Sequence, residues 1–139
     1  MENKKIESYK DSFVWQKGVY LVNDIYTITK KIPKEELFGL TNQMRRASVS
    51  IPSNIAEGWG RNSTKNYIQF IRFSRGSLYE LETLLVVARN QNFMDEKTKS
   101  LVSGKIDEIG KMLNKLIYIV WTLILTAYLL RSCSNNRYI

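Results

Sequence analysis

The feature that most constrains the fold is a row of apolar or small residues spaced alternately four and three positions apart between residues 67 and 88. Its members are Tyr67, Ile71, Ser74, Leu78, Leu81, Leu85 and Ala88. This spacing puts all of these side chains on one side of an α-helix, as in the seam of a helical bundle. Because Ser63 stands where an N-cap is needed, we expect a long helix over residues 63–90.

Three other segments carry apolar residues at helical spacing, near residues 12–31, 41–57 and 96–130. We expect the first segment to begin at Asp11 or Ser12 and to end at Pro33. The second should begin at Thr41 and end at Gly58 and Gly60, and the third of these segments should begin at Asp95. No segment alternates apolar and polar residues as a half-buried strand does. We therefore predict an all-α fold, an antiparallel up-down four-helix bundle. The length fits one domain over residues 1–139, with a polar N-terminal tail at 1–10 and a C-terminal tail at 131–139.

Pro52 lies inside the second of these helices, where proline removes one backbone hydrogen bond and pushes against the preceding turn. The apolar row nevertheless continues beyond it to Ile55. Serines at positions 48, 50 and 53 can bond the backbone groups that the proline leaves free. We therefore predict a continuous helix with a kink at Pro52 rather than a loop.

A polar stripe runs along the opposite side of the same helix and consists of Gln43, Arg46, Ser50, Ser53 and Glu57. The simplest interpretation is a face exposed to solvent, and a buried polar network or a ligand surface are the alternatives. Glu80 flanks the seam of the third helix, so we expect it to meet Arg45 or Arg46 across the bundle. We assign structural roles to Arg46, Pro52, Glu57 and Glu80.

Histidine, the residue that most often serves as a general base near neutral pH, is missing from the sequence. This absence removes Ser-His-Asp catalysis, histidine-ligated zinc and the usual general base. Its single cysteine, Cys133, is expected to be a reduced thiol, and no acidic cluster has metal-site spacing. Gly58-Trp59-Gly60 lacks the strand and the lysine of a nucleotide-binding loop. We expect no enzymatic activity, metal or cofactor. The charged N-terminus has no apolar stretch typical of a secretion signal, which predicts a cytoplasmic protein.

Positive charge is concentrated in one part of the chain. The net charge is +8, and residues 41–75 hold six basic residues and one acidic residue. On the third helix Lys65, Gln69 and Arg72 share one side, with Arg61 at the entrance and Arg75 on the flank. These five residues predict a surface that binds nucleic-acid phosphates, and a solvated basic face is the alternative.

A resemblance to a known family rests on the combination RRA-x-x-SIPSNIAEG-x-GR, which begins at Arg45, followed by GSL-x-EL-x-T, which begins at Gly76. The chain resembles the 23S rRNA-intervening-sequence proteins, four-helix bundles named after reading frames inserted in bacterial 23S rRNA genes. The resemblance covers most of the chain. It implies a bacterial cytoplasmic protein with an antiparallel four-helix fold, often a ring of five, without an established enzymatic activity. The family is also similar to an accessory protein of diversity-generating retroelements, which binds nucleic acid and a reverse transcriptase.

Two functions fit these observations. The first is a non-enzymatic oligomeric module that binds RNA or DNA, and the second is a structural or protein-interaction bundle, possibly accessory to a nucleic-acid enzyme. A second apolar stripe on the third helix and another on the first predict contacts between subunits, with a homopentamer as the state that the resemblance implies. These stripes comprise Ile68, Tyr79 and Val86, and Trp15, Val19, Val22 and Tyr26.

The segment from Leu116 to Leu130 departs from the family pattern because it contains no charged residue. It is 15 residues long, and a helix that crosses a bilayer needs about 18–20 apolar residues. We therefore expect a buried or interfacial helix end and no membrane span.

Overall fold

The computed structural model describes residues 7–135, with side chains up to Arg131, and these residues form four α-helices and two short 3-10 helices. No strand occurs among the described residues. The prediction of an all-α four-helix fold is confirmed. The elements are η1 (Tyr9–Asp11), α1 (Phe13–Thr29), η2 (Lys34–Glu36), α2 (Leu40–Gly60), α3 (Thr64–Asn90) and α4 (Glu96–Asn135).

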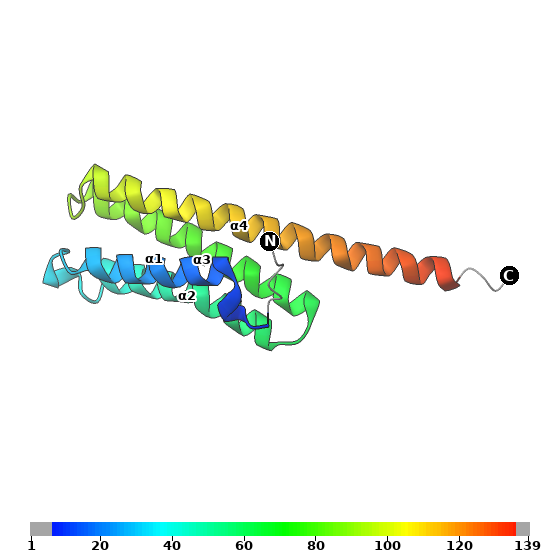
Figure 1. Ribbon diagram of the computed structural model, residues 1–139. Helices are drawn as coiled ribbons and strands as arrows, with labels where there is room; N and C mark the ends of the chain where they lie inside the picture. Colours follow the sequence, from blue (N-terminus) through cyan, green and yellow to red (C-terminus); the bar gives the residue numbers. More distant parts are fainter. Residues whose placement is uncertain (1–6, 136–139) are drawn as a thin grey trace.

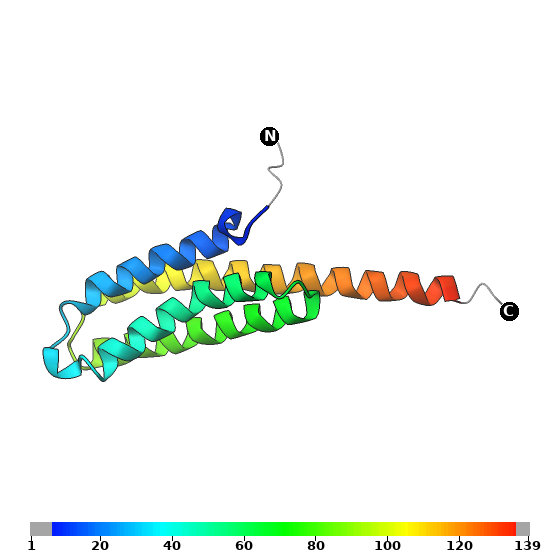
Figure 2. The same ribbon diagram turned by 90° about the horizontal axis from the view of Figure 1, so that it is seen from below.

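The four helices lie side by side along one common direction. Figures 1 and 2 show each helix returning toward the end where the previous one began. Helix α1 contacts α2 and α4, and α3 contacts the same two helices, so each helix has two neighbours. Helix α4 continues beyond the end of the bundle where α1 begins and where α2 connects to α3 (Figure 1).

The predicted apolar rows form the core. The largest side chains with almost no exposed surface come from all four helices. They include Leu21, Ile25, Met44, Ile51, Ile55, Ile71, Leu78, Leu81, Leu85, Ile106, Ile109 and Leu113. Removing a Leu or Ile side chain from water contributes about 1.5–3 kcal/mol, so the 4-3 rows supply the main driving force for this fold.

Three helix ends agree with the sequence. Ser63 caps α3 by accepting a hydrogen bond from the Asn66 amide. The carboxylate of Asp95 accepts a hydrogen bond of 2.6 Å from the Thr98 amide at the start of α4. This hydrogen bond lowers the pKa of Asp95 below its ordinary value. Pro33 follows the end of α1 and precedes η2.

The ends of α2 differ from the sequence prediction in their details, although the helix does end at Gly60, one of the two glycines expected to end it. The helix begins at Leu40, whose amide donates to the Glu36 carboxylate at 3.1 Å, and Thr41 is buried rather than capping. At the other end the helix continues through Gly58 to Gly60. A Cβ atom at Gly58 would lie 2.7 Å from the Cβ atom of Phe70. Gly58 therefore allows α2 and α3 to pack closely together, and it does not end the helix.

The helix containing Pro52 is continuous, as predicted, and the kink itself stays a prediction. Pro52 is buried, and α1 passes close to it at Gly18, where a Cβ atom would lie 3.4 Å from the proline ring. On the other side Ser74 of α3 donates a hydrogen bond of 2.9 Å to the carbonyl of Ile51. Contacts from both neighbouring helices thus hold the backbone around the proline.

We expect Pro52→Ala to keep the helical content and to change stability by no more than about 1–2 kcal/mol. Alanine removes a proline penalty of about 3 kcal/mol in a helix interior but also loses buried ring carbons. Far-UV circular dichroism and urea unfolding measure the two quantities. A large loss of helical signal would show that this segment depends on the proline for its conformation.

The first described residues are more ordered than a polar tail would be. Tyr9 and Lys10, which the sequence places in the N-terminal tail, lie in η1, and Ser8 caps this turn. The Tyr9 ring packs edge-on against Trp15 with centroids 5.3 Å apart. The rest of the expected N-terminal tail up to residue 6 lies outside the described residues, and so do the side chain of Cys133 and residues 136–139. Residues 131–135 of the expected C-terminal tail continue helix α4 instead.

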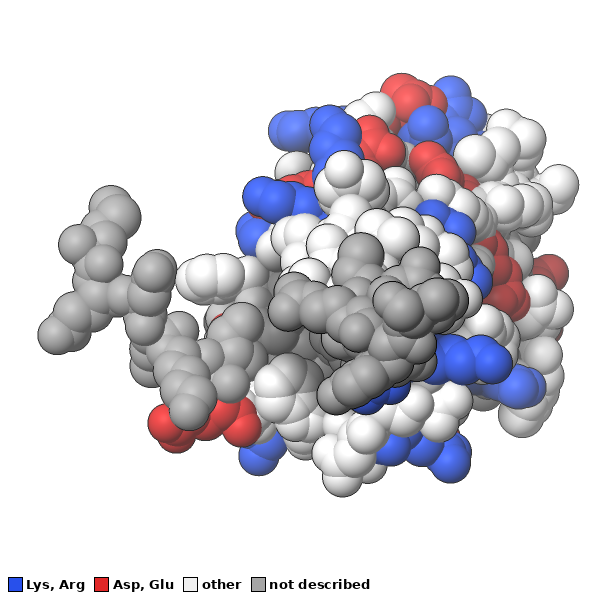
Figure 3. Space-filling view, turned by 90° about the vertical axis from the view of Figure 1, so that its right-hand side faces the viewer, with Lys and Arg blue, Asp and Glu red and all other residues white. Residues whose placement is uncertain are grey.

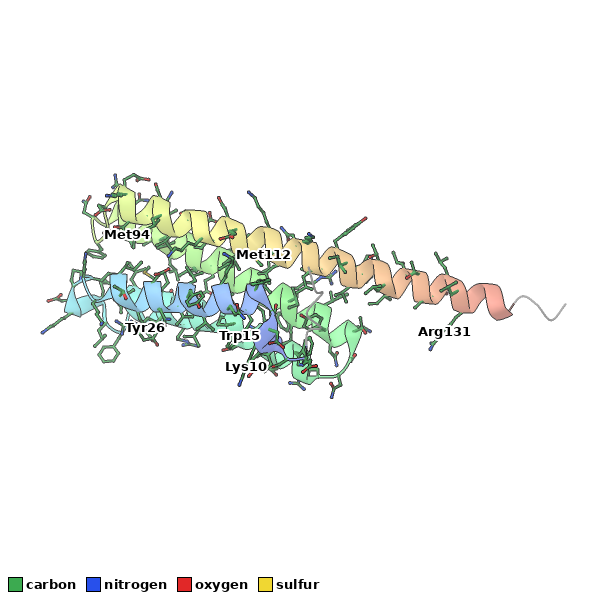
Figure 4. The ribbon with its side chains drawn as sticks, viewed as in Figure 1. Lys10, Trp15, Tyr26, Met94, Met112 and Arg131 are labelled. Carbon is green, nitrogen blue, oxygen red and sulfur yellow. The ribbon has the colours of Figure 1, made fainter. Side chains whose placement is uncertain are left out.

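The last part of α4 differs most from expectation. No side chain from Asn114 to Arg131 is buried, so the buried alternative for this helix end is wrong for the single chain, and the interfacial alternative stays a prediction. Among the described residues, the segment Glu96–Arg131 is the one helix long and apolar enough by length and composition to cross a membrane. Figure 4 shows this helix extending from Met112 to Arg131 past the other helices.

Candidate nucleic-acid interface

Three of the five predicted nucleic-acid residues form an exposed row on α3. Lys65, Gln69 and Arg72 point away from the core, on the side of the helix opposite Leu78 and Leu81. Lys65 and Arg72 are seven residues apart, which is about 10.5 Å along a helix axis. Neither cation forms an ion pair with a described residue. Both cations of this row are available to a ligand.

The other two predicted residues, Arg61 and Arg75, interact with side chains of the same chain. Arg61 forms an ion pair of 2.5 Å with Glu57, one turn earlier, and its guanidinium lies over the Phe70 ring. Arg75 donates a hydrogen bond of 2.8 Å to the Asn114 side chain on α4. Arg61 therefore stands at the entrance of the row as expected, whereas Arg75 connects α3 to α4.

Tyr79 continues the line of Lys65 and Arg72 at the same seven-residue spacing, and 51% of its surface is exposed. The sequence pattern places it instead in an apolar stripe with Ile68 and Val86. Ile68 is buried within the chain, so that stripe does not exist as one surface. The sequence signal that could have placed Tyr79 on the side of the cations is the repeated seven-residue spacing of Lys65, Arg72 and Tyr79.

A groove at the α1–α2 connection was not predicted. It has a volume of about 820 Å³ and its lining includes Tyr26, Phe38, Arg45 and Arg46. Phe38 is 88% exposed. The Arg45 guanidinium lies 4.8 Å from the centre of the Tyr26 ring, and its Nε donates to the Thr29 hydroxyl at 2.9 Å. Figure 4 places Tyr26 at the end of the bundle opposite the extension of α4.

The expected ion pair of Glu80 with Arg45 or Arg46 does not form. Arg46 and Glu80 line the same cavity of about 370 Å³ between α2 and α3, and neither is in an ion pair with a described residue. Ser50 lies in the same cavity and accepts hydrogen bonds of 2.9 Å from Ser77 and from Asn54. The polar stripe of α2 is thus mostly exposed, with one interhelical network at Ser50.

Little of the positive charge of this region is neutralised within the chain. Of the six basic residues between residues 41 and 75, only Arg61 is in an ion pair with a described residue. Figure 3 looks at the end of the bundle from which α4 extends, and it shows basic side chains in separate groups around the rim. Within residues 7–131, no three acidic or cysteine side chains form a group that could hold a metal ion.

Comparison with known proteins identifies the family. The model of the 23S rRNA-intervening sequence protein family matches residues 10–115. The chain belongs to this family. A protein of unknown function from the S23 ribosomal protein family of Bacteroides thetaiotaomicron has a similar crystal structure, with a TM-score of 0.70 and 21% identity. The similarity covers 75% of this chain and 97% of that one, and it shows a shared fold. A search of curated proteins finds no match.

The sequence signature, which lies within the matched residues, spans the contact between α2 and α3. Ser50 bonds Ser77 across this contact, and Gly58 packs against Phe70. The match to the 23S rRNA-intervening sequence protein family ends at residue 115. The charge-free segment from Leu116 onward is therefore an addition to the part of the chain that the family model describes.

Proposed function

We propose that this chain is a non-enzymatic, oligomeric module of the bacterial cytoplasm that binds RNA or DNA through α3. The observation that carries the proposal is the pair of exposed cations Lys65 and Arg72, which no described carboxylate neutralises. An anion that approaches this row does not have to displace an internal acidic partner. Counterions released by the phosphates then supply the free energy of binding.

The surroundings of the row suit a single strand. Phosphates would contact Lys65 and Arg72, Gln69 could bond a sugar or a phosphate, and a base could stack on Tyr79. The groove at Phe38 offers a second place where aromatic rings and arginines occur together. Stacking accepts every base, so we propose binding with little sequence preference.

Titration of the wild type with single-stranded RNA and DNA tests this function. We expect the logarithm of the binding constant to fall linearly with the logarithm of the salt concentration, by about 0.7 for each phosphate contact. Absence of binding at low salt would overturn the proposal and leave the structural or interaction bundle as the function.

Oligomers would increase the affinity by presenting several rows to one strand. Two exposed apolar areas support contacts between subunits. Val86 on α3 is 42% exposed, and a groove of about 340 Å³ lies between α1 and α2, lined in part by Trp15, Val19, Val22 and Pro52. The resemblance to known family members makes five the expected number of subunits.

We expect light scattering to give a mass several times the 16.2 kDa of one chain. Val86→Glu should weaken this assembly at least about tenfold, because a charge buried at an interface loses its hydration without a partner. Gly104→Glu, at an exposed position of α4 with open space around it, is the matched control and should leave the mass unchanged. A wild-type monomer at micromolar concentration would contradict the expectation.

A further inference from the structure

The α4 extension, defined here as Leu116 to Leu130, is apolar, and it lies outside the core except at Leu116 and Ile117, which pack against it. It contains 15 residues without a charge, between Lys115 and Arg131. None of its side chains is buried, and most are exposed. Figures 1 and 4 show no other helix beside its outer part. Such a surface in water is costly, at roughly 25 cal/mol for each Å² of apolar area.

The apolar surface surrounds the extension on all sides. Leu123 and Leu125 are about 200° apart around the helix axis, and both are exposed. A second helix that packed on this segment would cover one stripe and leave the opposite side in water. A medium that is apolar all round, such as the interior of a bilayer, covers the whole surface.

The threonine hydroxyls of the extension suit an apolar medium. Its two threonines satisfy their hydroxyls within the helix. Thr122 donates to the carbonyl of Ile119 at 2.8 Å, and Thr126 donates to the carbonyl of Leu123 at 3.0 Å. The helical backbone also bonds its own polar groups, so lipid around the helix would leave few hydrogen bonds unmade.

The ends of the extension have the residues that favour a membrane interface. Tyr118 lies near one end and Tyr128 near the other, Trp121 lies closer to the middle, and the flanking residues are the cations Lys115 and Arg131. The segment is about 22 Å long, compared with about 30 Å for a bilayer hydrocarbon core. Long basic side chains at both ends can reach the headgroups across part of this difference.

The bundle presents basic residues at the end from which the extension leaves. Arg61 and Lys65 flank the α2–α3 connection, which lies at this end in Figures 1 and 2. Figure 4 places Lys10 at the same end. Insertion of the extension would therefore bring these cations toward the headgroups, where anionic lipids attract them.

We propose that the α4 extension inserts into a lipid bilayer and anchors the bundle to the membrane surface. The proposal can be tested separately from nucleic-acid binding, because the extension contributes no residue to the α3 row, although Arg61 and Lys65 would serve both.

The test uses the full chain and vesicles of phosphatidylcholine mixed with phosphatidylglycerol. We expect the protein to float with the vesicles in a density gradient and to stay bound at high salt. Acyl chains brominated near the bilayer centre should quench the fluorescence of Trp121, and Trp121→Phe should remove this quenched component. Leu123→Glu/Leu125→Glu should reduce partitioning at least about a hundredfold.

The matched control is Asn23→Glu/Gly104→Glu, which makes the same change in charge at exposed positions of α1 and α4 within the bundle. It should float like the wild type, and circular dichroism should show both variants folded. Failure of the wild type to float, or equal flotation of the Leu123→Glu/Leu125→Glu variant, overturns the proposal. If those leucine substitutions instead dissociate an oligomer of a wild type that does not float, the extension binds other copies of the chain.

Discussion

Reversal of Lys65 and Arg72 to glutamate is expected to weaken the binding of single-stranded RNA at least about a hundredfold at low salt. Each substitution removes one cation that neutralises a phosphate and adds a repulsive charge at the same place. The slope of the salt dependence should become shallower by about 0.7 for each phosphate that is no longer neutralised. Fluorescence titration of labelled RNA and DNA at several salt concentrations measures both quantities. Further addition of Arg61→Glu should have a smaller effect, because Arg61 already forms an ion pair with Glu57.

The matched control is Lys97→Glu/Lys111→Glu, which makes the same change in net charge at exposed positions of α4. This variant should keep most of the affinity if the α3 row binds the phosphates. An equal decrease of affinity in the two variants would mean that the nucleic acid responds to overall charge, and the proposed interface would then be wrong.

Gly58→Val is expected to destabilise the fold by about 2–3 kcal/mol. A Cβ atom at this position would lie 2.7 Å from the Cβ atom of Phe70 and 3.2 Å from Cδ2 of Tyr67. The Phe70 atom is attached directly to the backbone of α3, so the clash cannot be relieved by rotating the end of a side chain. Helices α2 and α3 would have to separate, and urea unfolding followed by circular dichroism would measure the cost.

Gly60→Val is the control for this substitution, because nothing lies within 4 Å of a Cβ atom at Gly60. It should change the free energy of unfolding by less than about 1 kcal/mol. If both variants are destabilised equally, the effect comes from helix propensity rather than from the packing against Phe70.

The sequence predicts the four helices well because their apolar rows have the period of the helix and lie within single segments. The α2 row that continues to Ile55 and the α3 row through Leu78 and Leu85 are buried as expected. The prediction for Gly58 is wrong because a glycine that ends a helix and one that admits a neighbouring helix look alike in one sequence. The difference lies in Phe70, which is on another helix.

The candidate site was only partly predictable for the same reason. The exposed row of Lys65, Gln69 and Arg72 follows from spacing within α3. The engagement of Arg75 depends on Asn114, which is 39 residues away. The groove at Phe38 brings together residues from α1, α2 and the segment between them, and no local pattern marks it.

Helix α4 continues without a proline from Glu96 to Asn135, through the bundle and into its extension. A helix of 40 residues is about 60 Å long and bends little without a proline or a bulge. A domain on a glycine-rich linker can change its orientation freely relative to its anchor. The bundle cannot do so, because the rigid helix α4 connects it to any anchor at the far end. An anchor that holds the far end of α4 upright would fix the tilt of the whole molecule, and the α3 row would then face along the anchoring surface, with Lys65 at the end of the row nearest to it.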